Sequence, residues 1–182
     1  AWKESDAIIA RGRCNRDVLL GTSHLFTRDV FCFWEDRGEV RMQLKPHAPG
    51  IRKFSEQALT AKARTIIKSM RASKDSGKAV MFYSCIIGSI PGQTATAIKV
   101  ADTFVRSLRE RLDQVFIINP AEYFEPGMDG DDLMFMWEQV QRSGLINIWR
   151  FQSMEDIEAS FGLMGLKVPP VWSGKDATFS TG

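Results

Sequence analysis

Cysteine and histidine are scarce in this sequence, which limits the kinds of site that it can build. The three cysteines, Cys14, Cys32 and Cys85, are widely spaced and form no C-x-x-C pair, and there are only two histidines. Zinc sites and disulfide frameworks need closely spaced ligands or a paired set of cysteines. We therefore expect no metal, no cofactor and no disulfide, and a reducing compartment, either the cytoplasm or an organelle matrix.

Long apolar runs are also absent. No run approaches the roughly 18 residues that a membrane-spanning helix needs, so we expect no membrane span and a soluble chain or the soluble part of a complex. Residues 1–30 contain acidic side chains and no apolar core, which excludes a typical signal or transit peptide. The start at Ala1 without Met and the small polar run at 179–182 predict cuts within a longer polypeptide, or a processed start and a tail.

Two common phosphate-binding motifs are missing. A P-loop needs G-x-x-x-x-G-K-[ST], but Gly88 and Gly92 are one residue too close and Gln93 replaces the lysine. A dinucleotide fingerprint, G-x-G-x-x-G, does not occur. What remains is a glycine-bearing turn between an apolar run and a helical pattern: Gly88, Ser89, Ile90, Pro91, Gly92, Gln93 and Thr94. Such a turn presents backbone N–H groups at the positive end of a helix, so it predicts an anion site.

Charge is distributed unequally along the chain. Residues 1–78 carry 16 basic against 9 acidic side chains, whereas residues 79–182 carry 8 against 13. The basic half could face nucleic acid, an anionic membrane or an acidic protein partner, and protein partners are the expectation. Nucleic acid is not indicated, because the basic residues are not interleaved with aromatic ones. The structural alternative is a solvated helix face with surface loops.

The first part of the chain predicts an extension with a β-hairpin, over residues 1–50. Segments 29–34 and 39–44 are rich in β-formers or alternate with period two, and Gly38 lies in the turn between them. Ser5 could cap a short helix over 6–12. A long amphipathic helix is expected over 51–73.

The second part predicts an α/β domain over residues 51–172, followed by an extended tail over 173–182. Apolar strand patterns at 80–87, 115–119, 145–151 and 167–172 alternate with helical patterns at 95–112, 129–143 and 153–165. This alternation is typical of a mostly parallel sheet flanked by helices and joined by right-handed crossovers. We expect a flavodoxin- or Rossmann-like three-layer arrangement.

Ligands of such sheets bind outside the carboxyl ends of the strands, which here are followed by several polar side chains. Asn119 and Glu122 follow the second strand of the domain, and Glu158 lies early in the last helix. A carboxylate at that place could act as nucleophile or base toward a sugar carbon. The structural alternatives are a capping box between Ser153 and Asp156, and capping of a helix start by Asp129 and Asp131.

The order of these elements resembles the nucleoside 2-deoxyribosyltransferase-like superfamily over about residues 79–171. The resemblance rests on Val80-Met81-Phe82-Tyr83 before the glycine turn, on 115–122, on Ile157-Glu158 and on 165–169. Members of this family cleave or exchange the N-glycosidic bond of nucleosides or nucleotides. The resemblance implies that Glu158 is the nucleophile, that Tyr83 is its neighbour, and that residues 88–94 lie near a sugar or phosphate.

Two functions follow from the sequence. The first is a nucleoside- or nucleotide-binding domain of the N-glycosidic-bond transferase or hydrolase type, either active or degenerate. The second is a non-catalytic structural or interaction subunit of a larger protein assembly. The oppositely charged halves of the chain, five Trp and eight Met favour the second.

Overall fold

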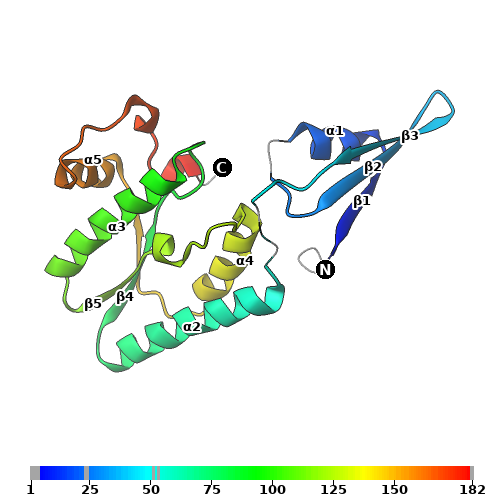
Figure 1. The fold of residues 1–182 in the computed structure, drawn as a ribbon. Coiled ribbons are helices and arrows are strands. Elements are labelled where there is room, and N and C mark those ends of the chain that lie inside the picture. Colours follow the sequence, from blue (N-terminus) through cyan, green and yellow to red (C-terminus); the bar gives the residue numbers. More distant parts are fainter. Residues whose placement is uncertain (1–4, 23–24, 51, 53, 181–182) are drawn as a thin grey trace. The chain divides into compact units, whose positions relative to one another are not determined.

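The computed structural model describes residues 5–22, 25–50, 52 and 54–180 (Figure 1). It forms two compact units, one of residues 1–62 with 125–136 and the other of residues 63–124 with 137–182. Ala1 and residues 181–182, for which the sequence predicts cut or processed ends, lie outside the described residues.

The first unit contains a three-stranded sheet with one helix. Strand β1 (Ala7–Arg11) runs parallel to β2 (Asp29–Asp36), and β2 pairs antiparallel with β3 (Glu39–Lys45), in the order β1-β2-β3. Helix α1 (Arg13–Gly21) connects β1 to β2. The predicted β-hairpin is therefore confirmed. Its turn residues Arg37 and Gly38 have φ values of 53° and 81°, the left-handed conformation that tight hairpin turns require.

The predicted helix over residues 6–12 is wrong. Residues Ala7–Arg11 are β1, and each of them has a Cα partner in β2. A run of five residues is too short to be a stable helix by itself, so pairing with a neighbouring strand decides its structure.

Helix α1 covers one face of this sheet. Val30 and Cys32 of β2 are fully buried and cluster with Ala10 and Phe26, and Leu19 of α1 packs against them. The Lys45 ammonium of β3 donates to the Leu19 and Thr22 carbonyls at the end of α1, at 3.2 and 2.7 Å. The cation thereby satisfies C-terminal carbonyls of the helix and ties β3 to it.

Two helices belong partly to each unit. Helix α2 (Glu56–Asp75) and helix α4 (Gly130–Gln141) contain the boundaries at 62/63 and 136/137. Asp129 and Asp132 cap the start of α4 reciprocally, because each carboxylate accepts the backbone N–H of the other residue, at 2.7 and 3.3 Å. The capping role predicted for Asp129 is therefore confirmed, and Asp132, which the sequence did not single out as a cap, shares it.

The second unit contains an all-parallel sheet in the order β5-β4-β6. Strand β4 (Ala79–Ser84) is central, with β5 (Val115–Ile118) and β6 (Ile148–Phe151) at its sides. Helix α3 (Thr94–Arg111) joins β4 to β5, and α5 (Met154–Leu163) follows β6. Short 3-10 helices occupy Pro120–Tyr123, Pro170–Trp172 and Ala177–Ser180.

The central strand β4 is buried because both of its faces are covered. Met81 and Tyr83 pack against Phe104, Val105 and other residues of α3, and Figure 1 shows α3 and α5 side by side above this sheet. On the opposite face, the ring of Phe82 lies 5.4 Å from the ring of Trp137 in α4 and 5.1 Å from that of Trp149. Burial on both faces explains the nearly continuous apolar sequence of this strand.

The α/β class and the parallel sheet are confirmed, but the sheet is smaller than predicted. The fourth strand expected at 167–172 is wrong, since Pro170–Trp172 is a 3-10 helix. Pro169 and Pro170 lack the N–H groups that a strand ladder needs. The wider sheet of a clear flavodoxin- or Rossmann-like fold is not formed within the described residues. No helix among these residues has the length and apolar character that crossing a membrane would require.

Candidate functional site

The carboxyl ends of β4 and β6 hold a buried polar cluster. The Tyr83 hydroxyl donates to Asp156 Oδ2 at 3.3 Å, and the Arg150 guanidinium donates to Asp156 Oδ1 at 2.6 Å. Asp156 is only 4% exposed, and its carboxylate also accepts the Ser153 N–H in a capping box. Burial, and then the Asp156 charge, raise the pKa of Tyr83 far above its ordinary value. This cluster therefore holds a neutral phenol against a paired carboxylate.

A second cluster joins the loop after β4 to the end of β5. Asn119 is fully buried, and its amide donates to Asp102 of α3 at 2.6 Å. Its carbonyl oxygen accepts the Ala121 N–H at 3.2 Å and lies 3.9 Å from the Cys85 sulfur. Burial raises the pKa of Cys85 to about 12 and also raises the pKa of Asp102. The thiol is thus protonated at neutral pH, which is the inert state of a cysteine.

Glu122 is already engaged by a cation. Arg109 of α3 binds both of its carboxylate oxygens, at 2.5 and 3.0 Å, and also donates to the Ile117 carbonyl at 2.8 Å. Such a two-bond pair is directional and fixes both side chains. The predicted ligand role of Glu122 would require this pair to open.

The glycine turn at 88–94 is exposed at Gly88, Ser89 and Gly92, whereas Ile90 is buried in the core between α3 and α5. A Cβ at Gly88 or Gly92 would meet no other atom within 4 Å, so the backbone is open to its surroundings. Gln93 does not cap α3 with its side chain, because its Oε1 instead accepts the Trp172 indole N–H at 3.3 Å. Thr94 is the first residue of α3.

The structure brings only some of the predicted site residues together. Tyr83 meets Asp156, while Glu158 is exposed. Residues two apart on a helix point in nearly opposite directions, since each residue turns the chain by about 100°. The nucleophilic role of Glu158 and the role of Tyr83 as its neighbour stay predictions. Sequence reasoning missed Arg150 and Gln152, although the capping box at Ser153 pointed to Asp156. The side-chain oxygen Oε1 of Gln152 accepts the Ile86 N–H at 3.2 Å and so fixes the loop after β4.

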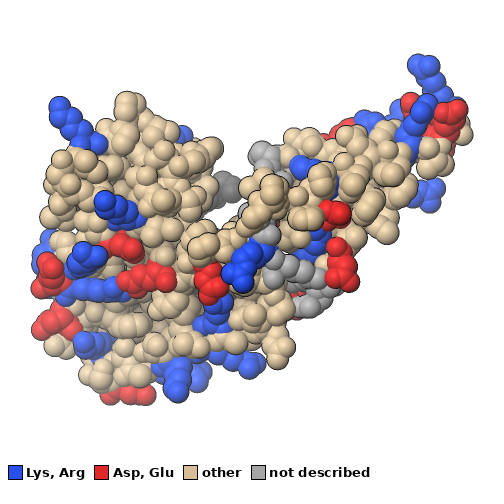
Figure 2. All heavy atoms as spheres, in the orientation of Figure 1, with Lys and Arg blue, Asp and Glu red and all other residues tan. Residues whose placement is uncertain are grey.

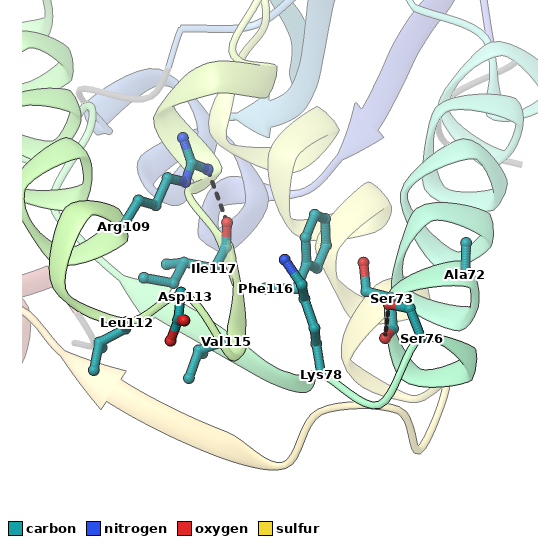
Figure 3. Close-up of a pocket in the computed structure, with 10 residues that line it drawn as sticks. All are labelled: Ala72, Ser73, Ser76, Lys78, Arg109, Leu112, Asp113, Val115, Phe116 and Ile117. Carbon is teal, nitrogen blue, oxygen red and sulfur yellow. Dashed lines mark hydrogen bonds between the residues drawn. The ribbon is translucent and has the colours of Figure 1, made fainter.

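A groove lies elsewhere, beside the outer edge of β5. It has a volume of about 510 Å³ and is open to the surface (Figure 3). We call it the β5 groove. Its walls come from α2 with the turn after it, from the residue before β4, from the end of α3 with the turn after it, and from β5: Ala72, Ser73, Ser76, Lys78, Arg109, Leu112, Asp113, Val115, Phe116 and Ile117. Sequence analysis did not find it, because its walls come from separate segments.

The first unit carries an uncovered apolar surface on the sheet face that α1 does not cover. The strand register places Ile9, Phe31 and Leu44 in one row, and Phe33 and Met42 in the next. We call this surface the open sheet face and define it by six residues: Ile9, Phe31, Phe33, Val40, Met42 and Leu44. Ile9 is 76% exposed, Val40 79% and Met42 56%. Contiguous exposed apolar surface of this kind is uncommon on proteins that act alone.

The charged side chains form no single-sign patch on the face seen in Figure 2, where Lys and Arg lie beside Asp and Glu. The β2-β3 hairpin follows this pattern, with ion pairs from Arg13 to Asp36 and from Arg41 to Glu39 at 2.9 and 2.8 Å. The local pairing reduces the field that the basic excess of residues 1–78 would otherwise create.

Within the part of the chain that the structure describes, no three His, Cys, Asp or Glu side chains are grouped so that they could hold a metal ion. Comparison with known proteins adds no relative, since no family model, no curated protein and no solved structure matches the chain.

Proposed function

We propose that this chain is an interaction subunit of a larger protein assembly, and that its open sheet face packs against an apolar surface of a partner protein. One observation carries the proposal. A three-stranded sheet buries one face under α1 and leaves six apolar side chains on the other. Sheets gain stability when both apolar faces are covered, so a partner would supply the missing layer.

The composition of this surface favours a protein partner. Its centre is apolar and includes the rings of Phe31 and Phe33, whereas Arg11 and Glu35 lie on the same face toward one end. Protein interfaces have this design, with aromatic residues and Met at the centre and polar residues at the rim. Each apolar side chain removed from water adds roughly 25 cal/mol per Å² of buried area, before the costs of association.

Neighbouring residues on β3 allow a matched test. Met42 belongs to the open sheet face, while Gln43 pairs with Cys32 and belongs to the α1 face. A photo-crosslinking amino acid is placed at position 42 or at position 43, and the chain is irradiated in the cells that produce it. We expect a discrete crosslinked complex from position 42, with its partner identified by mass spectrometry, and none from position 43. Equal crosslinking at both positions, or none at either, contradicts the proposal.

A second candidate is nucleoside or nucleotide binding of the N-glycosidic-bond transferase or hydrolase type. It is supported by the open backbone at Gly88 and Gly92 and by the absence of a side-chain cap at the start of α3. Backbone N–H groups at that position suit a phosphate. Asn119, Glu122 and the exposed Glu158 would complete the site, with Ser89, Gln93 and Thr94 in the turn. The engaged state of Glu122 makes this the weaker candidate.

Calorimetry with a panel of nucleosides and nucleoside monophosphates tests this candidate, followed by measurement of released base. Glu158→Gln is expected to abolish release of the base, while Glu155→Gln on the same helix leaves it unchanged. If no compound of the panel binds, or if Glu158→Gln turns over at the original rate, the candidate fails.

A further inference from the structure

The outer edge of β5 presents two backbone groups to the β5 groove. The Ala79 N–H donates to the Gln114 carbonyl, and Ala79 is in register with Val115. In a parallel ladder, every second residue directs both its N–H and its C=O toward the same neighbouring strand. Residues 114, 116 and 118 therefore direct these groups toward β4. The N–H and C=O groups of Val115 and Ile117 point the other way, toward the groove.

Two of these four outward groups are used inside the chain. The Val115 N–H donates to the Leu112 carbonyl at 3.2 Å, and the Ile117 carbonyl accepts from Arg109 at 2.8 Å. Among the described residues, the structure gives no partner to the Val115 carbonyl or to the Ile117 N–H. Ile117 as a whole is only 2% exposed, and its N–H faces the β5 groove, where an added strand would supply an acceptor.

The two remaining groups match a parallel strand. In parallel pairing, one residue of the added strand donates its N–H to a carbonyl of the edge strand. The C=O of the same residue accepts the N–H that lies two residues further along the edge strand. The Val115 carbonyl and the Ile117 N–H have this spacing. Antiparallel pairing would need both groups of Val115 or both groups of Ile117, and in each residue one group is already bonded. The edge is therefore suited to one strand direction.

The side chains of the groove specify what such a strand would carry. Its bonding residue would be in register with Phe116 and would point to the α2 side, where Ser73, Ser76 and Lys78 line the groove (Figure 3). Within the described residues, no acidic side chain pairs with the Lys78 ammonium. The residues before and after the bonding residue would face the α3 side, where the apolar Leu112 and Val115 line the groove together with Arg109 and Asp113.

We propose that the β5 groove binds an extended segment of a partner protein as a fourth, parallel strand, with the pattern apolar, acidic, apolar. The central residue exchanges two backbone hydrogen bonds with Val115 and Ile117, and its carboxylate pairs with Lys78. The charge on Arg109 is already balanced by Glu122, so Arg109 does not contribute to the preference for an acidic residue. Strand addition of this kind draws affinity from the main chain and specificity from alternate side chains. The β5 groove lies in the second unit and does not depend on the open sheet face of the first.

The test begins with selection of random linear peptides on the immobilised 182-residue chain. We expect selected peptides to share an acidic residue between two apolar ones. Ala72→Trp, which places an indole in the groove from α2, is expected to weaken binding about tenfold or more. Ser69→Trp, one helical turn away on exposed α2 surface, serves as its control. Lys78→Ala is expected to weaken acidic peptides and to have little effect on their amide analogues.

Two further measurements need no change in the protein. N-methylation of the central peptide residue removes the bond to Val115 and should weaken binding about tenfold, whereas N-methylation of a neighbour should not. A nitroxide on the peptide's amino terminus should broaden the NMR signals of Asp113 and Lys78 more than that of Glu122. The proposal is overturned if no peptide is selected, if the nitroxide reports the opposite direction, or if Ala72→Trp and Ser69→Trp bind equally.

Discussion

The Tyr83 hydroxyl and the Asp156 carboxylate meet at 3.3 Å and thereby connect the central strand β4 to helix α5. Arg150 of β6 completes the contact by binding the other oxygen of the same carboxylate. Three elements that are distant in the sequence thus converge on one buried charge. Removing one partner of a buried ion pair leaves the other charge uncompensated, which is strongly destabilising. Loss of this contact should therefore destabilise the second unit.

Loss of the Asp156 carboxylate is expected to destabilise the chain far more than loss of the nearby Glu158 carboxylate. Asp156→Ala removes the capping box and leaves Arg150 without its partner, at a cost of about 2 kcal/mol or more. The cost is moderated because the Arg150 side chain is 40% exposed. Glu158→Ala lies on the exposed face and should change the free energy of unfolding by less than about 0.5 kcal/mol. Urea denaturation followed by Trp fluorescence compares the two variants.

Tyr83→Phe isolates the hydroxyl from the ring. The ring stacks on Phe104 at 5.6 Å and would stay in place, whereas the hydroxyl and its hydrogen bond to Asp156 are lost. We expect a loss of about 1 kcal/mol of unfolding free energy. A loss of 3 kcal/mol or more, a value typical of a large cavity, would show that the ring had moved.

Features of this structure that depend on residues close together in the sequence were predictable, and features that depend on distant residues were not. The β2-β3 hairpin was predictable because Gly38 and the alternation around it are local signals. Strand β1 was not, since its pairing with β2 spans more than twenty residues and its five residues carry no period of their own. The strand expected at 167–172 failed because Pro169 and Pro170 outweigh the apolar residues beside them.

The candidate site was predicted only at the level of its edge. The alternation of strands and helices predicted a parallel sheet and placed Asn119 and the start of α5 at one end of it, and the family resemblance added Tyr83. Whether Asp156 or Glu158 faces Tyr83 depends on how α5 is rotated about its axis. The sequence did not determine this rotation. The β5 groove was beyond prediction, because it depends on which backbone groups of Val115 and Ile117 remain unused after the chain has folded.

Thiol reactivity should distinguish the three cysteines. Cys14 is exposed, Cys32 is buried with a raised pKa, and the pKa of Cys85 is raised to about 12. At pH 8 the thiolate fraction of Cys85 is only ~10⁻⁴, so a disulfide reagent should modify one thiol per chain rapidly. Cys14→Ser should abolish this rapid phase, and urea should release the other two. Rapid modification of Cys85 in the folded Cys14→Ser chain would refute this assignment.

The ionisation of Asp102 should make the second unit less stable at neutral pH than at acidic pH. Burial raises the folded-state pKa of Asp102 above the unfolded value of 3.8, despite the hydrogen bond from Asn119, and the Glu122 charge adds to the shift. The folded state therefore binds the proton more tightly, and stability falls as the pH rises from below 3.8 through the folded pKa. Asp102→Asn removes this loss. The urea midpoint of Asp102→Asn minus that of the original chain should therefore be larger at pH 7 than at pH 3.

The open sheet face should be detectable in the isolated chain through dye binding and self-association. Met42→Lys places a charge on this face, whereas Gln43→Lys places the same charge on the α1 side of the same strand. Met42 is already 56% exposed, so neither change creates a cavity, and both variants should retain the unfolding midpoint of the original chain. Binding of a hydrophobic fluorescent dye and the mass measured by light scattering should fall for Met42→Lys alone. Equal dye binding by both variants would mean that the face is not the main apolar surface of the isolated chain, and its assignment as the partner-binding surface would then lose its physical basis.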